Sequence, residues 1–404
     1  VRGDRTRFEE KEIKKRASFV DYFVELDQIR EQLPLIVQQV GLGGDVDQVL
    51  ESETSGKAIM GNELFNKDSE LAGFRISSGM TMNRLLDIGK ASDTISIQSP
   101  FVKISEGCDN FCTYCVVPYG RGKEVSRSLE EIKSDVLGLV QSGQKQVTLL
   151  GQNVNSWGLE PSQKAKIRIN TAAKLPFADL LRQLHQIDGL EKLSFMTANP
   201  FDFTDDLVEA MTLPKIDRHL HMAVQSGSDR ILKLMNRKHT IAEYEELIQK
   251  LRARIPDLTL GTDLIVGFPG ETEEDFESLL DFISEAKIDR VGVFPYFPEE
   301  GTPAATMERQ VPLEVKQERV DRITLLQEKV SLERQRRFEG RILKVLVEVS
   351  EPDEGFAEGR SFREAPEVDG VVEIRSGRFP DPGEFVPVLV TEAMEHDLVG
   401  EVVQ

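Results

Sequence analysis

The sequence GCDNFCTYCVVPYGRG, residues 107–122, contains every cysteine of the chain. Cys108, Cys112 and Cys115 are the only 3 cysteines among 404 residues, and they follow the spacing Cys-x-x-x-Cys-x-x-Cys. An odd number of thiols placed so close together argues against a disulfide framework. Three thiolates on one short loop suit a metal centre. An iron–sulfur cluster with three cysteine ligands keeps one iron free to bind something else.

Two simpler interpretations of this loop remain open. A structural zinc ion needs a fourth ligand, and the nearest histidine, His185, lies 70 residues past Cys115. Three unrelated core cysteines would not be expected to gather within eight positions. We therefore favour the cluster.

The composition describes an ordinary globular protein, with 39% hydrophobic and 30% charged residues. No apolar run approaches the roughly 18 residues of a membrane span, and no secretory signal is visible. A thiolate cluster suits a reducing compartment, so we expect a cytoplasmic protein without a membrane partner. The net charge of −20 argues against a broadly basic nucleic-acid-binding surface but leaves room for a local one.

From residue 99 onward, strand-like runs alternate with helical patterns, which predicts parallel βαβ units. The six predicted strands are Phe101–Ile104, Val147–Leu150, Leu193–Met196, Leu220–Val224, Leu258–Val266 and Val291–Phe297. The predicted helices include Leu129–Val140, Phe177–Ile187, Ala242–Leu251 and Glu273–Ala286. We expect a partial parallel (β/α)6 barrel, with the cysteine loop directly after its first strand. Barrel active sites lie at that end of the strands.

The whole chain divides into four predicted parts, one of which is this barrel. Residues 1–40 show an amphipathic pattern, and residues 41–95 are a connecting segment. Residues 96–338 form the barrel core and end in a charged helix. Residues 339–404 contain short strands separated by Gly and Pro turns, which predicts a small antiparallel β-barrel and an α/β fold overall.

A polar or glycine-containing signal follows several of the predicted strands. The residues singled out are Gly151, Gln152 and Asn153 after the second strand, Gln225 and Ser226 after the fourth, and Val266 and Gly267 at the end of the fifth. Glycine allows close backbone approach to a ligand, although helix-capping turns would look the same. His219 and His221 share one face of the fourth strand. They could line the barrel, but structural histidines are commoner.

The core resembles the methylthiotransferases, a family of radical S-adenosylmethionine (radical SAM) enzymes that insert sulfur and a methyl group into a C–H bond. The matching stretches are CDNFCTYCVVPYGRG, GQNVNSWG, HLHMAVQSGSDRILKLMNR, DLIVGFPGETEEDF and EGTPAA. The tail resembles the TRAM domain that ends these proteins, and residues 12–40 resemble the last part of their N-terminal domain.

The resemblance implies a [4Fe–4S] cluster and S-adenosylmethionine as cofactors, with Cys108, Cys112 and Cys115 as cluster ligands and as the catalytic residues. Tyr114 would then meet the adenine, together with the apolar residues around Val266. Gly151, Gln152 and Asn153 would hold the methionine part. Gln225 and Ser226 would contact the ribose or carboxylate, and Arg121 is a further candidate for the carboxylate or the substrate.

Family members carry three further cysteines in their N-terminal domain, and this chain has none of them. The chain also begins with Val1, so we interpret it as truncated. We expect this chain to bind one cluster and to cleave S-adenosylmethionine. A second [4Fe–4S] cluster is expected only in the full-length protein.

Two family branches compete for the substrate. GQNVNSWG, TANPFDFTDDL and QSGSD resemble the tRNA branch (MiaB type), which modifies an isopentenylated adenosine beside the anticodon. GRSFREAPEVDGVV in the tail resembles the branch that modifies an aspartate of a small-subunit ribosomal protein (RimO type). Residues 339–404 hold 16 Asp and Glu against 6 Lys and Arg, a balance of −10 that suits a basic protein partner. We rank tRNA first, because the core motifs surround the cofactor.

A different class of function is a non-catalytic iron–sulfur or RNA-binding regulator. The motifs at the barrel mouth are all present, which favours an enzyme over a regulator. We expect a monomer that receives electrons from a reducing donor.

Overall fold

The computed structural model describes residues 101–404, apart from residues 165, 353–354, 365–369, 376–378 and 404. The predictions for residues 1–40 and 41–95 lie outside the described residues. Within the described part, every helix is too short or too polar to cross a membrane.

All six predicted strands form, and they pair in parallel. They are β1 (Phe101–Lys103), β4 (Gln146–Leu150), β5 (Lys192–Phe195), β6 (His219–His221), β7 (Thr259–Val266) and β8 (Arg290–Pro295). β1, β4 and β5 form one sheet, and β6, β7 and β8 form a second. Single parallel bridges, Leu193 to Ile216 and Ala198 to Met222, join the two. The strands thus follow chain order, as the predicted partial barrel requires.

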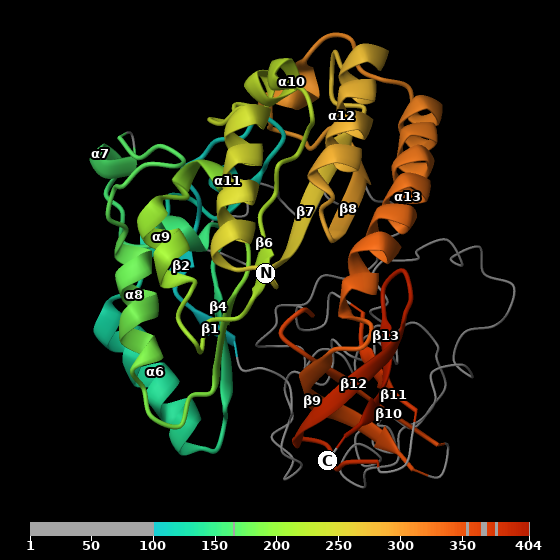
Figure 1. Ribbon diagram of the computed structural model, residues 1–404. Helices are drawn as coiled ribbons and strands as arrows, with labels where there is room; N and C mark the ends of the chain where they lie inside the picture. The colour runs from blue at the N-terminus through green and yellow to red at the C-terminus, as the bar shows by residue number, and fades with distance from the viewer. Residues whose placement is uncertain (1–100, 165, 353–354, 365–369, 376–378, 404) are drawn as a thin grey trace, which may run out of the picture. The chain divides into compact units, whose positions relative to one another are not determined.

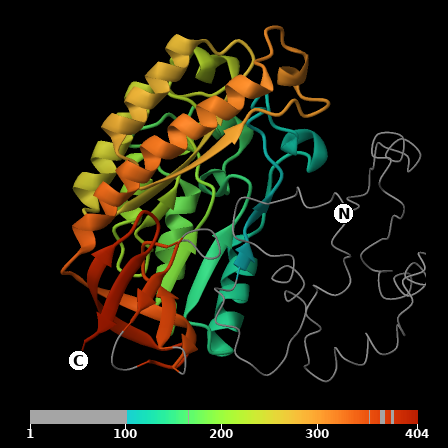
Figure 2. The same cartoon turned by 90° about the vertical axis from the view of Figure 1, so that its right-hand side faces the viewer.

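Helices connect the strands. The main ones are α6 (Leu129–Gln141), α8 (Pro176–His185), α9 (Asp205–Ala210), α10 (Asp229–Leu234), α11 (Ile241–Arg254) and α12 (Glu273–Ala286). Of these, α6, α10, α11 and α12 begin at a Ser or Thr side chain that caps the helix. The predicted helix Glu273–Ala286 is confirmed as α12, and the Thr272 side chain caps its start by accepting a hydrogen bond from the backbone N–H of Asp275. In both views, α12 runs beside α13 (Leu313–Gln335) on the outside of β7 and β8 (Figures 1 and 2).

The tail forms the predicted small barrel, which is closed in the order β10-β11-β13-β12-β9. Its strands are β9 (Ile342–Glu351), β10 (Phe356–Arg360), β11 (Val372–Ile374), β12 (Phe385–Ala393) and β13 (Leu398–Val402). Its pairings are antiparallel, as predicted, except that β11 and β13 run parallel. A separate cluster of buried apolar side chains fills it.

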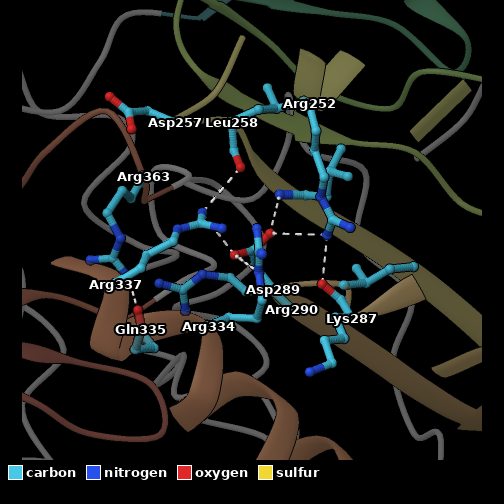
Figure 3. A network of polar contacts seen from close by, with 12 residues as sticks. Arg252, Asp257, Leu258, Lys287, Asp289, Arg290, Arg334, Gln335, Arg337 and Arg363 are labelled. Atoms are coloured by element: carbon cyan, nitrogen blue, oxygen red, sulfur yellow. Dashed lines mark hydrogen bonds and ion pairs between the residues drawn. The ribbon is translucent and has the colours of Figure 1, made fainter. Parts of the chain in front are cut away.

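The segment after β10 meets the beginnings of the barrel strands. Lys192 at the start of β5 donates to the carbonyl of Ser361 at 2.9 Å, and His219 at the start of β6 lies 3.1 Å from the carbonyl of Arg363. Figure 3 shows the polar network beside this segment, where Asp289 accepts bonds from Arg334 and Arg337. The base of the strand layer is therefore closed by charged groups that have partners.

Candidate functional site

The cysteine loop is closed by a short two-stranded ribbon that the sequence did not predict. β2 (Ser105–Glu106) pairs with β3 (Val125–Ser126), and the N–H of Cys108 donates to the carbonyl of Gly122 at 3.2 Å. Gly107 has a φ of +79°, and a Cβ there would lie 2.2 Å from the carbonyl oxygen of Lys123. Only glycine allows the loop to close this tightly.

The three cysteines are free thiols, with Cys112 buried and the other two partly exposed. Burial, helped by the neighbouring thiols, raises the pKa of Cys108 to about 11, and burial also raises the pKa of Cys115. Iron would have to displace these protons, and the three thiols stand together on one short loop where two of them are partly exposed. The donor set therefore fits a cluster that binds three cysteines.

Among the described residues, no three His, Cys, Asp or Glu side chains, the three cysteines included, are placed around a point where one metal ion could sit. A structural zinc ion needs four ligands that converge on a single centre.

A cavity of about 200 Å³ lies beside the cysteine loop. Its lining residues are Tyr114, Gln225, Asp263, Ile265, Phe294, Pro295, Tyr296 and Phe297. Tyr114 comes from the cysteine loop and Gln225 from the turn that follows β6, so the fold brings together two residues that the sequence had singled out separately. A larger cavity of about 320 Å³, lined by Leu129 and Trp157 among others, contains none of the predicted site residues.

Gln225 and Ser226 lie in a turn that is held firmly. Gln225 has a φ of +78°, and its N–H and carbonyl bond to Asp263 and Ile265 of β7 at 3.0 and 2.9 Å. Ser226 is buried, and its hydroxyl accepts a hydrogen bond from the N–H of Ser228 at 3.2 Å. The turn places the Gln225 side chain in the wall of the cavity. The Ser226 hydroxyl stabilises the turn through its hydrogen bond to Ser228.

The Gly151–Asn153 segment supports the cysteine loop. The Gln152 side-chain oxygen accepts a hydrogen bond from the N–H of Gly107 at 2.7 Å. Asn153 is buried and donates to Asp202 at 3.0 Å, while burial raises the pKa of that carboxyl. A Cβ on Gly151 would lie 2.4 Å from the hydroxyl of Ser105. These contacts show that the Gly151–Asn153 segment holds the cysteine loop in position. Direct contacts between this segment and the cofactor stay a prediction.

The end of β7 differs in one detail from the expectation. Val266 is fully buried in the main core, and Ile265 lines the cavity in its place. Gly267 has a φ of +70°, its N–H donates to Glu271 at 2.8 Å, and a Cβ on it would lie 2.3 Å from Cγ of Lys316. Gly267 therefore shapes the loop through its backbone.

The sequence reasoning missed Arg237, which follows α10. Its guanidinium lies 3.7 Å from Sγ of Cys112 and 5.1 Å from the centre of the Phe201 ring, and it donates to the carbonyl of Ala223. The residue lies inside the quoted stretch HLHMAVQSGSDRILKLMNR, but nothing in that stretch shows that this cation reaches a cysteine. Arg121, the cation that the sequence did single out, is exposed.

The profile of the Radical SAM superfamily matches residues 102–283, and that of the TRAM domain matches residues 340–403. The cysteine loop, the parallel strands and the closed tail barrel therefore belong to a radical SAM protein with a TRAM domain. Such a protein uses a [4Fe–4S] cluster and S-adenosylmethionine. Among solved structures, coproporphyrinogen III oxidase (HemN) from Escherichia coli has a TM-score of 0.41 and 18% identity, covering 66% of this chain and 67% of that chain.

Sequence similarity to curated proteins identifies the family within this superfamily. The ribosomal protein uS12 methylthiotransferase RimO of Desulfitobacterium hafniense is 42% identical over 308 residues, covering 76% of this chain and 67% of that protein. The tRNA-2-methylthio-N6-dimethylallyladenosine synthase of Caldicellulosiruptor saccharolyticus is 37% identical over 396 residues. The match covers 94% of this chain and 79% of that protein. The chain belongs to the methylthiotransferase family. Among these and further curated relatives, the match covers between 51% and 79% of the relative's own length.

Proposed function

We propose that this chain is the catalytic core of a radical SAM methylthiotransferase that acts on an isopentenylated adenosine beside the tRNA anticodon. The observation that carries this choice is the aromatic wall of the cavity beside the cysteines. Phe294 and Phe297 line it with 50% and 70% of their surface exposed, beside Tyr114, which is kept as the proposed contact to the adenine of S-adenosylmethionine. Such rings stack on the flat faces of bases splayed out of an RNA. An aspartyl side chain presents no such face.

Part of the tail stretch that resembles the ribosomal-protein branch is buried. Ser361, Arg363 and Glu364 belong to the stretch that resembles that branch, and they are 2%, 1% and 0% exposed. Buried residues of this kind hold the domain in place and have no surface left for a substrate. The acidic charge of the tail still disfavours RNA there, so we place the RNA contacts at the core, where Arg121 and Lys123 are exposed after the last cysteine.

In this proposal each part of the site has a defined task. Cys108, Cys112 and Cys115 would hold the cluster, which with S-adenosylmethionine would supply the radical chemistry needed for hydrogen abstraction. Gln152 keeps the cysteine loop in position through its bond to Gly107. The aromatic side chains of the cavity orient the base and exclude water from it. Gln225, Asn153 and Ser226 are kept as proposed cofactor contacts.

The sulfur-donating half of the reaction needs more than these three cysteines. They can ligate one cluster, so we expect about four irons per chain after anaerobic reconstitution. A second cluster would come from the N-terminal domain that the family carries. Iron for two clusters on this chain alone would contradict this part of the proposal.

The test is to express the complete reading frame in a bacterial host that lacks both methylthiotransferase branches. Mass spectrometry then compares the nucleosides of tRNA with peptides of the small-subunit ribosomal protein. Methylthio-isopentenyladenosine is the expected product. Methylthio-aspartate would replace the proposal with the ribosomal-protein branch, which the 42% identity to a RimO protein keeps as the second candidate.

The same material tests whether the protein is an enzyme at all. Reduced and reconstituted protein should release 5′-deoxyadenosine from S-adenosylmethionine. A regulator that binds a cluster without catalysis would release none. We expect this activity in the cytoplasm, with a reducing electron donor as partner.

A further inference from the structure

The interior of the strand layer holds a histidine–aspartate pair to which the proposed chemistry assigns no role. Nε2 of His221, at the end of β6, lies 3.1 Å from Oδ2 of Asp263 in β7. Asp263 lines the same cavity as Tyr114 and Gln225. It precedes Ile265 by two positions on the same face of β7, which places it about 7 Å deeper along the strand. The pair therefore forms a polar floor below the aromatic wall.

Glycines on the neighbouring strands make room for the pair. Gly261 is paired with His221 across β6 and β7, and Gly292 is paired with Asp263 across β7 and β8. A Cβ on Gly261 would lie 3.0 Å from Nδ1 of His221, and a Cβ on Gly292 would lie 2.6 Å from Oδ1 of Asp263. Glycine inside a strand is unfavourable and often marks a place where something else approaches closely.

The pair remains accessible although β7 has a strand on each side. The side chains of His221 and Asp263 are 25% and 36% exposed, whereas Leu260 and Leu264, on the other face of β7, are 2% and 0% exposed. Complete α/β barrels usually fill this space with branched apolar side chains. Here a carboxylate oxygen, Oδ1, points toward the gap that Gly292 leaves.

His219, two residues before His221, has a different task. It is 8% exposed and lies against the carbonyl of Arg363 in the tail. The strand therefore uses one histidine for packing at the base and places the other against Asp263, which lines the cavity.

We propose that Asp263, held by His221, contacts the substrate and selects a nucleobase that carries an N–H donor against an anionic side chain. This rests on the proposed function and names the group that reads the base. A carboxylate accepts hydrogen bonds through two oxygens, and an N–H on the edge of adenine is a suitable donor. The same carboxylate repels the carboxylate of an aspartyl substrate. Asp263 is thus a specificity residue, and His221 is a positioning residue.

The test uses the complete protein with three variants: Asp263→Asn, His221→Ala and His221→Gln. Two activities are measured on each: methylthiolation of an anticodon stem–loop that contains isopentenyladenosine, and release of 5′-deoxyadenosine without RNA. Asp263→Asn should lower kcat/KM for the stem–loop about 10- to 100-fold, the loss expected for one hydrogen bond to a charged group. Release of 5′-deoxyadenosine should stay within about twofold, because Asp263 is assigned to the substrate and not to the cofactor.

His221→Ala should give a smaller loss on the stem–loop, and His221→Gln should restore most of it, since glutamine can still hold Asp263. Asp135→Asn is the matched control, because Asp135 pairs with Arg127 at 2.7 Å on the surface of α6. Iron content and circular dichroism establish that each variant is folded and loaded.

The outcomes separate this inference from the proposed function. Wild-type protein that makes methylthio-isopentenyladenosine supports the function, and an Asp263→Asn variant as active as wild type would then overturn the inference alone. A parallel loss of both activities in Asp263→Asn would also overturn it, since that would assign Asp263 to the cofactor. Wild-type protein that modifies only the ribosomal peptide would overturn both.

Discussion

The two ends of the strand layer use charged groups in opposite ways. At the base, Arg363 and Glu364 are 1% and 0% exposed and pair with each other at 2.6 Å. At the cavity, His221 and Asp263 also pair, yet both remain partly exposed beside a gap left by glycine. A charge that is buried against a partner of opposite sign stabilises one arrangement, whereas a charge that is partly exposed to a cavity can bind a ligand. We therefore assign a role in fold stability to the charged pair at the base and a role in substrate recognition to the pair at the cavity.

The largest effect is expected from removing a cluster ligand at the cavity end. Replacing Cys108, Cys112 or Cys115 with Ala should abolish cluster loading and 5′-deoxyadenosine release, because two thiolates cannot hold the cluster in place. Iron content and chromatographic assay of 5′-deoxyadenosine measure this. A cysteine variant that keeps full activity would remove that residue from the ligand set.

At the base, Arg363→Met should destabilise the fold without changing the chemistry of the remaining folded protein. Glu364 would lose its closest cation, and breaking a buried pair costs about 3–5 kcal/mol. Arg290, which lies 3.8 Å from Glu364, should keep the effect near the lower value. A drop in Tm of roughly 10 °C is expected. Arg375→Met is the matched control, since its pair with Glu373 is exposed and worth less than about 1 kcal/mol.

The base should also respond to acid. Burial acts to raise the pKa of Glu364, but Arg363 and Arg290 outweigh it and hold the pKa below its ordinary value. A carboxyl group whose pKa is lowered on folding contributes stability above its unfolded pKa of about 4.3, and this stability is lost as the pH falls further. Tm measured from pH 6 downward should therefore fall less steeply for Glu364→Gln than for wild type. Parallel curves would refute this role of Glu364.

A smaller effect is expected at Arg237, where the cavity end meets the cluster. Arg237→Gln removes the cation that lies 3.7 Å from Cys112 Sγ, so the reduced cluster loses a stabilising charge. We expect a lower reduction potential and cofactor cleavage slower by on the order of tenfold. Redox titration followed by electron paramagnetic resonance measures the potential. Lys238→Gln is the control, because that cation lies over the same Phe201 ring.

The smallest effect is expected at the rim of the cavity. Phe297→Ala should weaken binding of the anticodon stem–loop about tenfold, the loss of one stacking contact, while Tm stays nearly constant because the ring is 70% exposed. Leu325→Ala, another exposed apolar residue at 61%, should leave binding unchanged. Fluorescence anisotropy with labelled RNA distinguishes the two. Equal affinities for both variants would argue against a stacking role.

Much of the fold could be predicted from local sequence pattern. The six strands, the helix Glu273–Ala286 and the tail barrel follow from periodicity and turn residues, which act over a few positions. The parallel pairing of β11 with β13 could not be predicted, because strand direction inside a small barrel depends on how distant segments meet. The β2–β3 ribbon was missed because two-residue strands carry too little pattern.

The sequence by itself determined the class of chemistry, since three thiols at a fixed spacing on one loop limit the centre they can hold. It also determined that His219 and His221 share a strand face, because side chains alternate along a strand. Only the tertiary structure decided that His219 packs against the tail while His221 meets Asp263, and that Ile265, not Val266, lines the cavity. Alternation gives the direction of a side chain, but its function depends on which distant residue lies opposite.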